Sequence, residues 1–102
     1  MLLEKIGKPA MLEQTAEECA ELAHACLKLA RYYRNENKVY GKTEEELIDN
    51  LAEEMADVEI CIDEIVRGFE VFKHYDGWFE KKSNRLYKRL EELDNADRSD
   101  EE

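Results

Sequence analysis

Hydrophobic residues recur at three- and four-residue intervals along most of the chain, which is the spacing of one face of an α-helix. Pro9 suits the first turn of a helix, so the pattern predicts a first long helix over about residues 8–34. The stretch Asn35–Lys42 is the most loop-like part of the sequence. Thr43–Glu46 then has the form of a capping box that opens a second helix, which we expect to run to about Arg67.

The last third of the chain is less regular. Residues 69–75 are ambiguous, and Asp76 followed by Gly77 predicts the start of a last helix. Residues 94–102 hold five acids, one arginine and no large apolar side chain, so we expect a disordered acidic tail after a domain of residues 1–93. Together these features predict an all-α fold, a helical bundle of about three to four helices. So few helices leave apolar faces open, and homo-oligomerisation is expected to complete the bundle.

The composition narrows the class of protein. With 102 residues the chain forms one domain, and four Gly and one Pro are too few for the turns of a β-sandwich or barrel. A net charge of -11 repels nucleic acid, and no apolar stretch is long enough for a membrane span. We therefore expect a cytoplasmic protein that binds neither a nucleic-acid polymer nor a membrane. Cys19, Cys26 and Cys61 include no CxxC pair and are expected to be reduced, apolar core residues.

Two acidic residues of the first helix fall where the core should be. At about 100° per residue, Glu18 lies inside the apolar stripe of this helix. Glu21 lies about 60° further round, so the two carboxylates project together. The stripe itself contains Cys19, Leu22, Cys26, Leu29, Ala30 and Tyr33.

The second helix repeats this arrangement. Glu54 lies within its apolar stripe, and Asp57 lies about 60° beyond. Asn50, one turn before Glu54, points in the same general direction, so it is either a hydrogen-bonding residue of the site or an ordinary solvated asparagine. The stripe contains Leu47, Leu51, Met55, Val58, Ile62, Ile65 and Val66.

Carboxylates in an apolar interface must be neutralised, because an unpaired charge there is costly and four together repel one another. Oxygen ligands of this kind are the ones that Mg2+ prefers, with Mn2+ as an alternative. The doubled pattern therefore favours a metal site at Glu18, Glu21, Glu54 and Asp57 over four solvated surface acids.

Charge is also divided along the chain. Residues 44–64 contain ten acids and no base, whereas residues 81–89 contain five bases and no acid. Lys82, Arg85 and Arg89 share one face of the last helix. On that face they suit either contacts with phosphate oxygens or salt bridges to the acidic second helix.

At these positions the sequence resembles a known family. Residues 17–21 (EECAE) are similar to the EExxE motif, and residues 54–57 (EMAD) to the ExxD motif, of the MazG-like all-α nucleoside triphosphate pyrophosphohydrolases. This superfamily includes dimeric dUTPases and phosphoribosyl-ATP pyrophosphatases. The likeness extends over residues 17–31, 53–65 and 82–90. The 32 residues between Glu21 and Glu54 form a longer interval than many members show, which bears on substrate choice.

The resemblance implies Mg2+-dependent hydrolysis of a ribo- or deoxynucleoside triphosphate between its α- and β-phosphates, giving the monophosphate and pyrophosphate. Such a reaction suits housecleaning of the nucleotide pool. The resemblance also implies that the metal is held by Glu18, Glu21, Glu54 and Asp57. It implies that Glu17 orients or deprotonates the attacking water or holds a second ion. Phosphate contacts are implied for Lys82, Arg85, Lys28, Arg31 and Arg89, and the family's assemblies imply a homodimer or homotetramer.

Two other functions fit parts of the sequence. Glu21 and His24 form an ExxH, and two copies of it with two Glu54 side chains would make a di-iron carboxylate site, but His24 is expected to face solvent. The acidic face alone would suit a non-catalytic helical module that binds a basic partner. The sequence does not locate a nucleobase pocket; the aromatic candidates for stacking are Tyr32, Tyr33, Tyr40 and Trp78.

Overall fold

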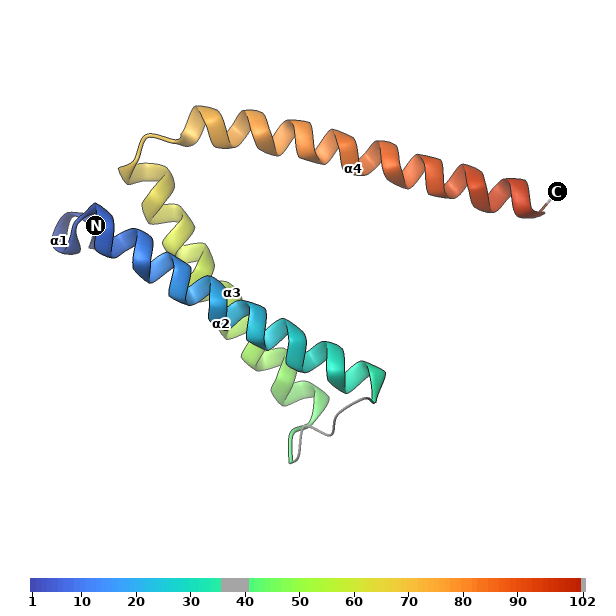
Figure 1. The fold of residues 1–102 in the computed structure, drawn as a ribbon, viewed down its shortest axis with the longest axis horizontal. Helices are drawn as coiled ribbons and strands as arrows, with labels where there is room; N and C mark the ends of the chain where they lie inside the picture. The colour runs from blue at the N-terminus through green and yellow to red at the C-terminus, as the bar shows by residue number, and fades with distance from the viewer. Residues whose placement is uncertain (36–40, 102) are drawn as a thin grey trace. The chain divides into compact units, whose positions relative to one another are not determined.

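The computed structural model describes residues 1–35 and 41–101, with side chains up to residue 98. The described residues form four α-helices and no strand, so the all-α prediction is confirmed. The helices, drawn in Figure 1, are α1 (Leu2–Ile6), α2 (Lys8–Arg34), α3 (Glu44–Gly68) and α4 (Phe72–Glu101). The chain divides into two compact units after Phe69, and each unit is described by itself.

Helices α2 and α3 form an antiparallel hairpin (Figure 1). Near one end, Met11 of α2 packs with Cys61 of α3, and Met11 is completely buried. At the other end, the hydroxyl of Tyr33 donates a hydrogen bond of 3.1 Å to Glu44. The two helices therefore lie against each other along most of their length, each through a single stripe of side chains.

The helix boundaries of the hairpin follow the sequence prediction closely. The hydroxyl of Thr43 accepts a hydrogen bond of 3.1 Å from the backbone N–H of Glu46, which confirms Thr43 as the N-cap of α3. Helix α2 ends at Asn35, whose left-handed backbone (φ 56°) lets its N–H bond the carbonyl of Tyr32. Most of the long interval between the two acidic motifs is therefore helix, with only residues 35–43 between α2 and α3.

The short helix α1, which the sequence did not predict, is held by α3. The backbone N–H groups of Leu2 and Leu3 donate hydrogen bonds of 3.1 and 3.2 Å to the Glu64 carboxylate. These bonds hold the pKa of Glu64 below its ordinary value. Leu3 is buried beside Met11, and any side chain at Gly68 would overlap it. Glycine at this position therefore lets α1 approach the end of α3.

Helix α4 corrects two predictions at the C-terminal end. It begins at Phe72 rather than near Gly77, because a glycine inside a helix costs only about 1 kcal/mol and the helical apolar spacing already starts with Phe72. It continues through Glu101, so residues 94–101 are helical where the sequence predicts a disordered tail. The described side chains of these last turns, residues 94–98, are exposed.

The cysteine prediction is right for Cys61 and wrong for two others. All three thiols are free, but Cys19 and Cys26 are exposed and only Cys61 is buried. The exposure follows from the direction in which α2 meets α3. The side chains of α2 that face α3 are centred on Met11 and Ala25, and Cys19 and Cys26 lie about 100° to one side of that line.

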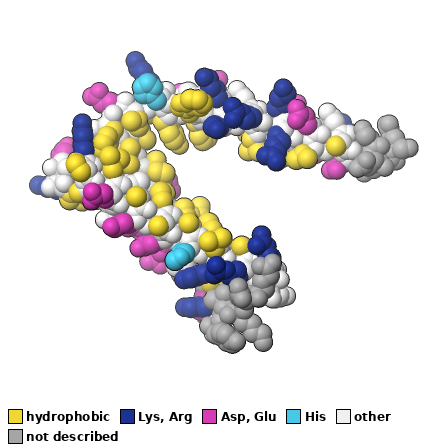
Figure 2. Space-filling model, in the orientation of Figure 1, with side chains coloured by type: hydrophobic (Ala, Val, Ile, Leu, Met, Phe, Trp, Pro, Cys, Tyr) yellow, Lys and Arg dark blue, Asp and Glu magenta, His cyan; other side chains and the backbone are white. Residues whose placement is uncertain are grey.

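One side of the hairpin is left as an exposed apolar surface, which we call the hairpin apolar face. It contains Leu12, Ala16, Cys19, Ala23, Cys26 and Tyr33 of α2 with Ile48, Met55 and Ile62 of α3. We call the stripe of side chains through which α2 and α3 pack together the contact stripe. On both helices the residues of the hairpin apolar face lie to the same side of it, so in an antiparallel pair they form one surface. Figure 2 shows hydrophobic side chains along one edge of the hairpin and acidic side chains along the other.

None of the helices within residues 1–35 and 41–101 combines the length and the apolar character that crossing a bilayer requires.

We expect Glu64→Ala to weaken the attachment of α1 at neutral pH. Because the pKa of Glu64 is lowered in the folded protein, its contribution to stability is present above the unfolded-state pKa and is lost as pH falls through the folded-state pKa. Thermal unfolding followed by circular dichroism should show a lower Tm than wild type at pH 7 and a difference that shrinks toward pH 3. The exposed Glu59→Ala is the matched control, and a difference independent of pH would contradict the assignment.

Candidate metal centre

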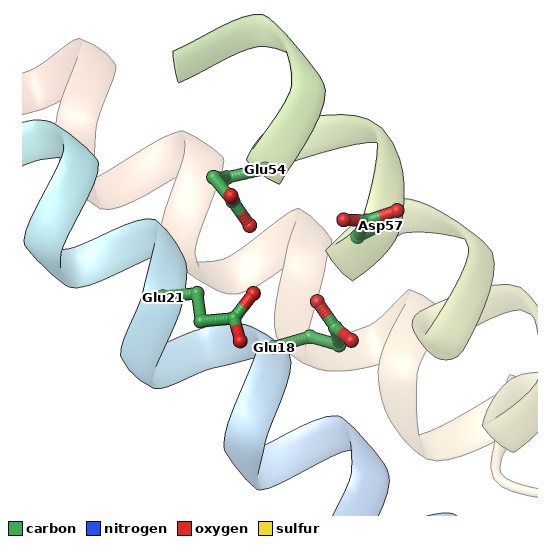
Figure 3. Close-up of side chains that lie close together, drawn as sticks. All are labelled: Glu18, Glu21, Glu54 and Asp57. Carbon is green, nitrogen blue, oxygen red and sulfur yellow. The ribbon is translucent and has the colours of Figure 1, made fainter. Parts of the chain in front are cut away.

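Four carboxylates from two helices meet in the middle of the hairpin. Glu18 and Glu21 come from α2, and Glu54 and Asp57 come from α3; Figure 3 shows the four side chains converging between the helices. One carboxylate oxygen from each of the four lies within 4.8 Å of those of the other three. The structure therefore brings together all four acids that the sequence assigned to a metal site.

The antiparallel register explains why these acids meet. Each helix carries its two acids three residues apart, on neighbouring turns of one face. Reversing the direction of one helix places Glu54 nearest Glu21 and Asp57 nearest Glu18, as their electrostatic coupling also indicates. Apolar contacts on both sides of the acids fix this register.

The two acids nearest the contact stripe are only partly satisfied. Glu18 and Glu54 are half-buried, and the Oε2 atom of each is buried without a hydrogen-bond partner. The other oxygen of Glu18 accepts a hydrogen bond of 2.7 Å from Gln14. Buried polar atoms are normally paired, so two unpaired carboxylate oxygens in one cluster indicate a missing ligand. Sequence reasoning missed Gln14, although its position one turn before Glu18 on the same helix face was a usable signal.

The electrostatics of the cluster point in the same direction. Burial is the main cause that raises the pKa of Glu18, and the charges of Glu21 and Asp57 add to it while the bond from Gln14 opposes it. For Glu54, burial again comes first, followed by a hydrogen bond with Glu21 that requires a proton and by like charges. Ionising the whole cluster is therefore unfavourable unless a cation neutralises it.

A hard divalent cation fits this set of donors. Mg2+, Mn2+ and Ca2+ all take carboxylate oxygens, and the donor set contains no sulfur or imidazole that would favour a softer metal. His24 is exposed and outside the cluster, so within the described residues the di-iron alternative lacks its histidine. Glu17 is also exposed and outside the cluster, one turn before Glu21 on the same helix face.

A second group of predicted residues meets two turns from the acids. Lys28 and Asn50 line a pocket of about 140 Å³ together with Lys42, Glu46 and Leu47. Leu47 is buried beneath it, and Asn50 is half-buried. Arg31 is exposed and does not line this pocket. Sequence reasoning named Lys28 and Asn50 but missed Lys42 and Glu46, which come from the loop end and the first turn of α3.

The basic residues of α4 belong to the other unit. Lys82, Arg85 and Arg89 are exposed on this helix, and their phosphate contacts stay a prediction because the two units are described separately. Among the aromatic candidates, Tyr33 packs edge-on against Tyr32, with 5.9 Å between ring centroids. The ammonium of Lys81 lies 5.0 Å from the ring centre of Trp78. Tyr40 lies outside the described residues.

Comparison with known proteins does not assign the chain to a family. No protein-family model matches it, and searches of curated proteins and of solved structures find no match either. The resemblance in the two acidic motifs therefore stays a prediction. The geometry of the four carboxylates is the observation that bears on function.

We expect Glu54→Gln to stabilise the metal-free protein at neutral pH and to weaken its response to Mg2+. Because the pKa of Glu54 is raised on folding, its contribution favours the folded state below the unfolded-state pKa and is lost as pH rises through the folded-state pKa. In EDTA at pH 7 the variant should therefore have a higher Tm than wild type. The difference in Tm between the two proteins should shrink as the pH is lowered.

Added Mg2+ should raise the Tm of wild type, by an amount equivalent to about 2.7 kcal/mol at 100 times the dissociation constant. Glu54→Gln should lose most of this increase, whereas the exposed neighbour Glu53→Gln should keep it. An equal Mg2+ response in both variants would contradict a metal site at these four acids.

Proposed function

We propose that the chain is a Mg2+-dependent nucleoside triphosphate pyrophosphohydrolase, which releases a nucleoside monophosphate and pyrophosphate. The observation that carries the proposal is the pair of buried, unpartnered carboxylate oxygens on Glu18 and Glu54, inside a cluster of four acids from two facing helices. The similarity of the segments that supply these acids to the EExxE and ExxD motifs is what suggests this particular reaction. With this activity, the chain would remove unwanted nucleoside triphosphates from the nucleotide pool of the cytoplasm.

In this proposal the four clustered acids bind the metal, and Glu17 is the general base for the attacking water. When bound, Mg2+ would offset part of the negative charge of the cluster, polarise the phosphate and lower the pKa of a water molecule beside it. Glu17, which is exposed one turn before Glu21 on α2, accepts the proton of the attacking water. The water oxygen forms a bond to the α-phosphorus while the bond to the bridging oxygen breaks, and pyrophosphate departs.

Cationic and amide side chains complete the substrate site in this proposal. Lys28 and Asn50 lie along the hairpin from the acids, and Arg31 is exposed further round α2. The phosphate contacts of Lys82, Arg85 and Arg89 on α4 stay a prediction from the sequence. Such contacts explain how a chain of net charge -11 binds an anion, because they act at short range where screening by salt is weakest.

The decisive test is turnover of a panel of ribo- and deoxynucleoside triphosphates by the purified protein, with products resolved by anion-exchange chromatography. We expect monophosphate and pyrophosphate in the presence of Mg2+, and none in EDTA. Glu54→Gln should lower kcat/KM by at least about 100-fold, since losing even an outer partner of a metal ligand costs 10- to 100-fold.

The control for this experiment is Glu53→Gln, which changes the same charge one residue away and should leave turnover near wild type. Absence of turnover across the panel, with helical structure intact and no stabilisation by Mg2+, would remove the hydrolase proposal. A non-catalytic helical interaction module would then be the better description of the chain.

We further propose that the hairpin apolar face is covered by a second copy of the chain. Contiguous exposed apolar residues of this kind are typical of an interface, and along the middle of α2 the small residues Ala16, Cys19, Ala23 and Cys26 lie beside the large residues Ile48, Met55 and Ile62 of α3. A two-fold axis would set the large residues of each copy against the small residues of the other. The acids Glu21 and Asp57 lie on the opposite side of the contact stripe, so the metal centre would stay open.

Cys26→Glu should therefore convert the assembly to monomers, because it places a charge in the middle of the hairpin apolar face. Light scattering after size exclusion should give two or four chain masses for wild type and one for this variant. His24→Glu, on an exposed part of α2 outside the face, is the matched control and should keep the wild-type mass. A monomeric wild type would contradict the proposal.

A further inference from the structure

The pocket next to the acid cluster is built in the same register on both helices. Lys28 follows Glu21 by seven residues, and Asn50 precedes Asp57 by seven. Seven residues are two helical turns, so each pocket residue lies about 10 Å along its helix from an acid of the cluster, on nearly the same face. Because α2 and α3 are antiparallel, both displacements point toward the loop end of the hairpin. The pocket and the cluster thus lie along one line between the helices.

The charge of this pocket differs from that of its surroundings. Lys28 reaches it from α2 and Lys42 from the segment before α3, whereas Glu46 is its only acid among the described lining residues. Residues 44–64 of α3 contain nine further acids and no base. Two lysines that converge from separate elements on one small pocket, in a chain of net charge -11, indicate an anionic ligand.

The size and lining of the pocket indicate which part of a nucleotide it takes. A volume of about 140 Å³ is below the 300–1,000 Å³ of pockets that hold a whole drug-sized ligand, so only a fragment fits. Among the described lining residues there is no aromatic side chain on which a base would stack. Ammonium groups and the amide of Asn50 are instead donors that phosphate oxygens accept from.

We propose that Lys28, Lys42 and Asn50 hold the terminal phosphates of the substrate, which leave as pyrophosphate. The assignment rests on the proposed hydrolase function and gives the substrate a direction: phosphates toward the loop end of the hairpin, nucleoside toward the other end. The same assignment explains why the interval between the two acidic motifs is long. The extra turns of α2 and α3 beyond the acids are the elements that build this pocket.

The test is calorimetric titration of inorganic pyrophosphate into wild type and into Lys28→Ala, Lys42→Ala and the double variant, in the presence of Mg2+. Lys5→Ala, an exposed lysine on α1, is the matched control. We expect each pocket variant to weaken pyrophosphate binding by about tenfold, as for the loss of a charge-assisted hydrogen bond, and the control to leave it unchanged. The effect should decrease as salt concentration rises.

Metal binding is measured on the same proteins, by titration of Mn2+ without pyrophosphate, and should be unchanged in the lysine variants. Wild-type binding of Mn2+ without binding of pyrophosphate, or pyrophosphate affinity that is the same in all lysine variants, would overturn the pocket assignment. Lysine-dependent pyrophosphate binding without turnover of any nucleoside triphosphate would instead support the pocket and reject the hydrolase function. A change in base preference with unaltered pyrophosphate affinity would overturn the assignment in favour of a nucleobase site.

Discussion

The close approach of four carboxylates at the contact between α2 and α3 is the constraint on which the rest of the structure depends. Two of them, Glu18 and Glu54, occupy positions in the contact stripe that apolar side chains would otherwise fill. Their mutual repulsion opposes the hairpin, and buried contacts on either side of them hold it together. Met11 packs with Cys61 on one side, and Ala25 and Leu47 are buried on the other. The hairpin is thus strongest where it flanks the acids, as a rigid metal site requires.

The two sides of the hairpin differ in chemical character because its two helices run in opposite directions. Antiparallel packing places equivalent helix faces on the same side, so apolar residues such as Cys26 and Met55 gather on one surface. The same geometry gathers Glu21 and Asp57 on the other side, with Lys28 and Asn50 further along. A partner subunit on the first surface would therefore leave the second free for a ligand. The proposed assembly surface and the proposed metal centre are about half a turn apart on each helix.

The sequence predicted the acid cluster because helical spacing alone fixes which residues share a face, and two matching acid pairs on two helices have few ways to meet. It misplaced Cys19 and Cys26 because α2 has two adjacent apolar faces, and spacing does not say which of them contacts α3. Helix α1 was missed because its five residues are too few for a periodic pattern. The carboxylate that accepts its hydrogen bonds belongs to Glu64, 62 residues from Leu2 in the sequence. The pocket residues Lys42 and Glu46 were missed for the same reason, since only tertiary structure brings the start of α3 to Lys28.

The net charge of the chain is a weaker guide to its ligands than the placement of single charges. At physiological ionic strength, charges further away than about 8 Å are largely screened, so most of the acids on α3 have little effect on an anion beside Lys28 and Lys42. A divalent cation among the four clustered acids would offset two of their negative charges and would itself be a ligand for phosphate oxygens. In the proposed function, the acids and the lysines along one line between the two helices would form a single site, with the metal and the phosphate chain in adjacent positions. Under the proposed function, a strongly acidic protein would in this way bind a strongly acidic substrate.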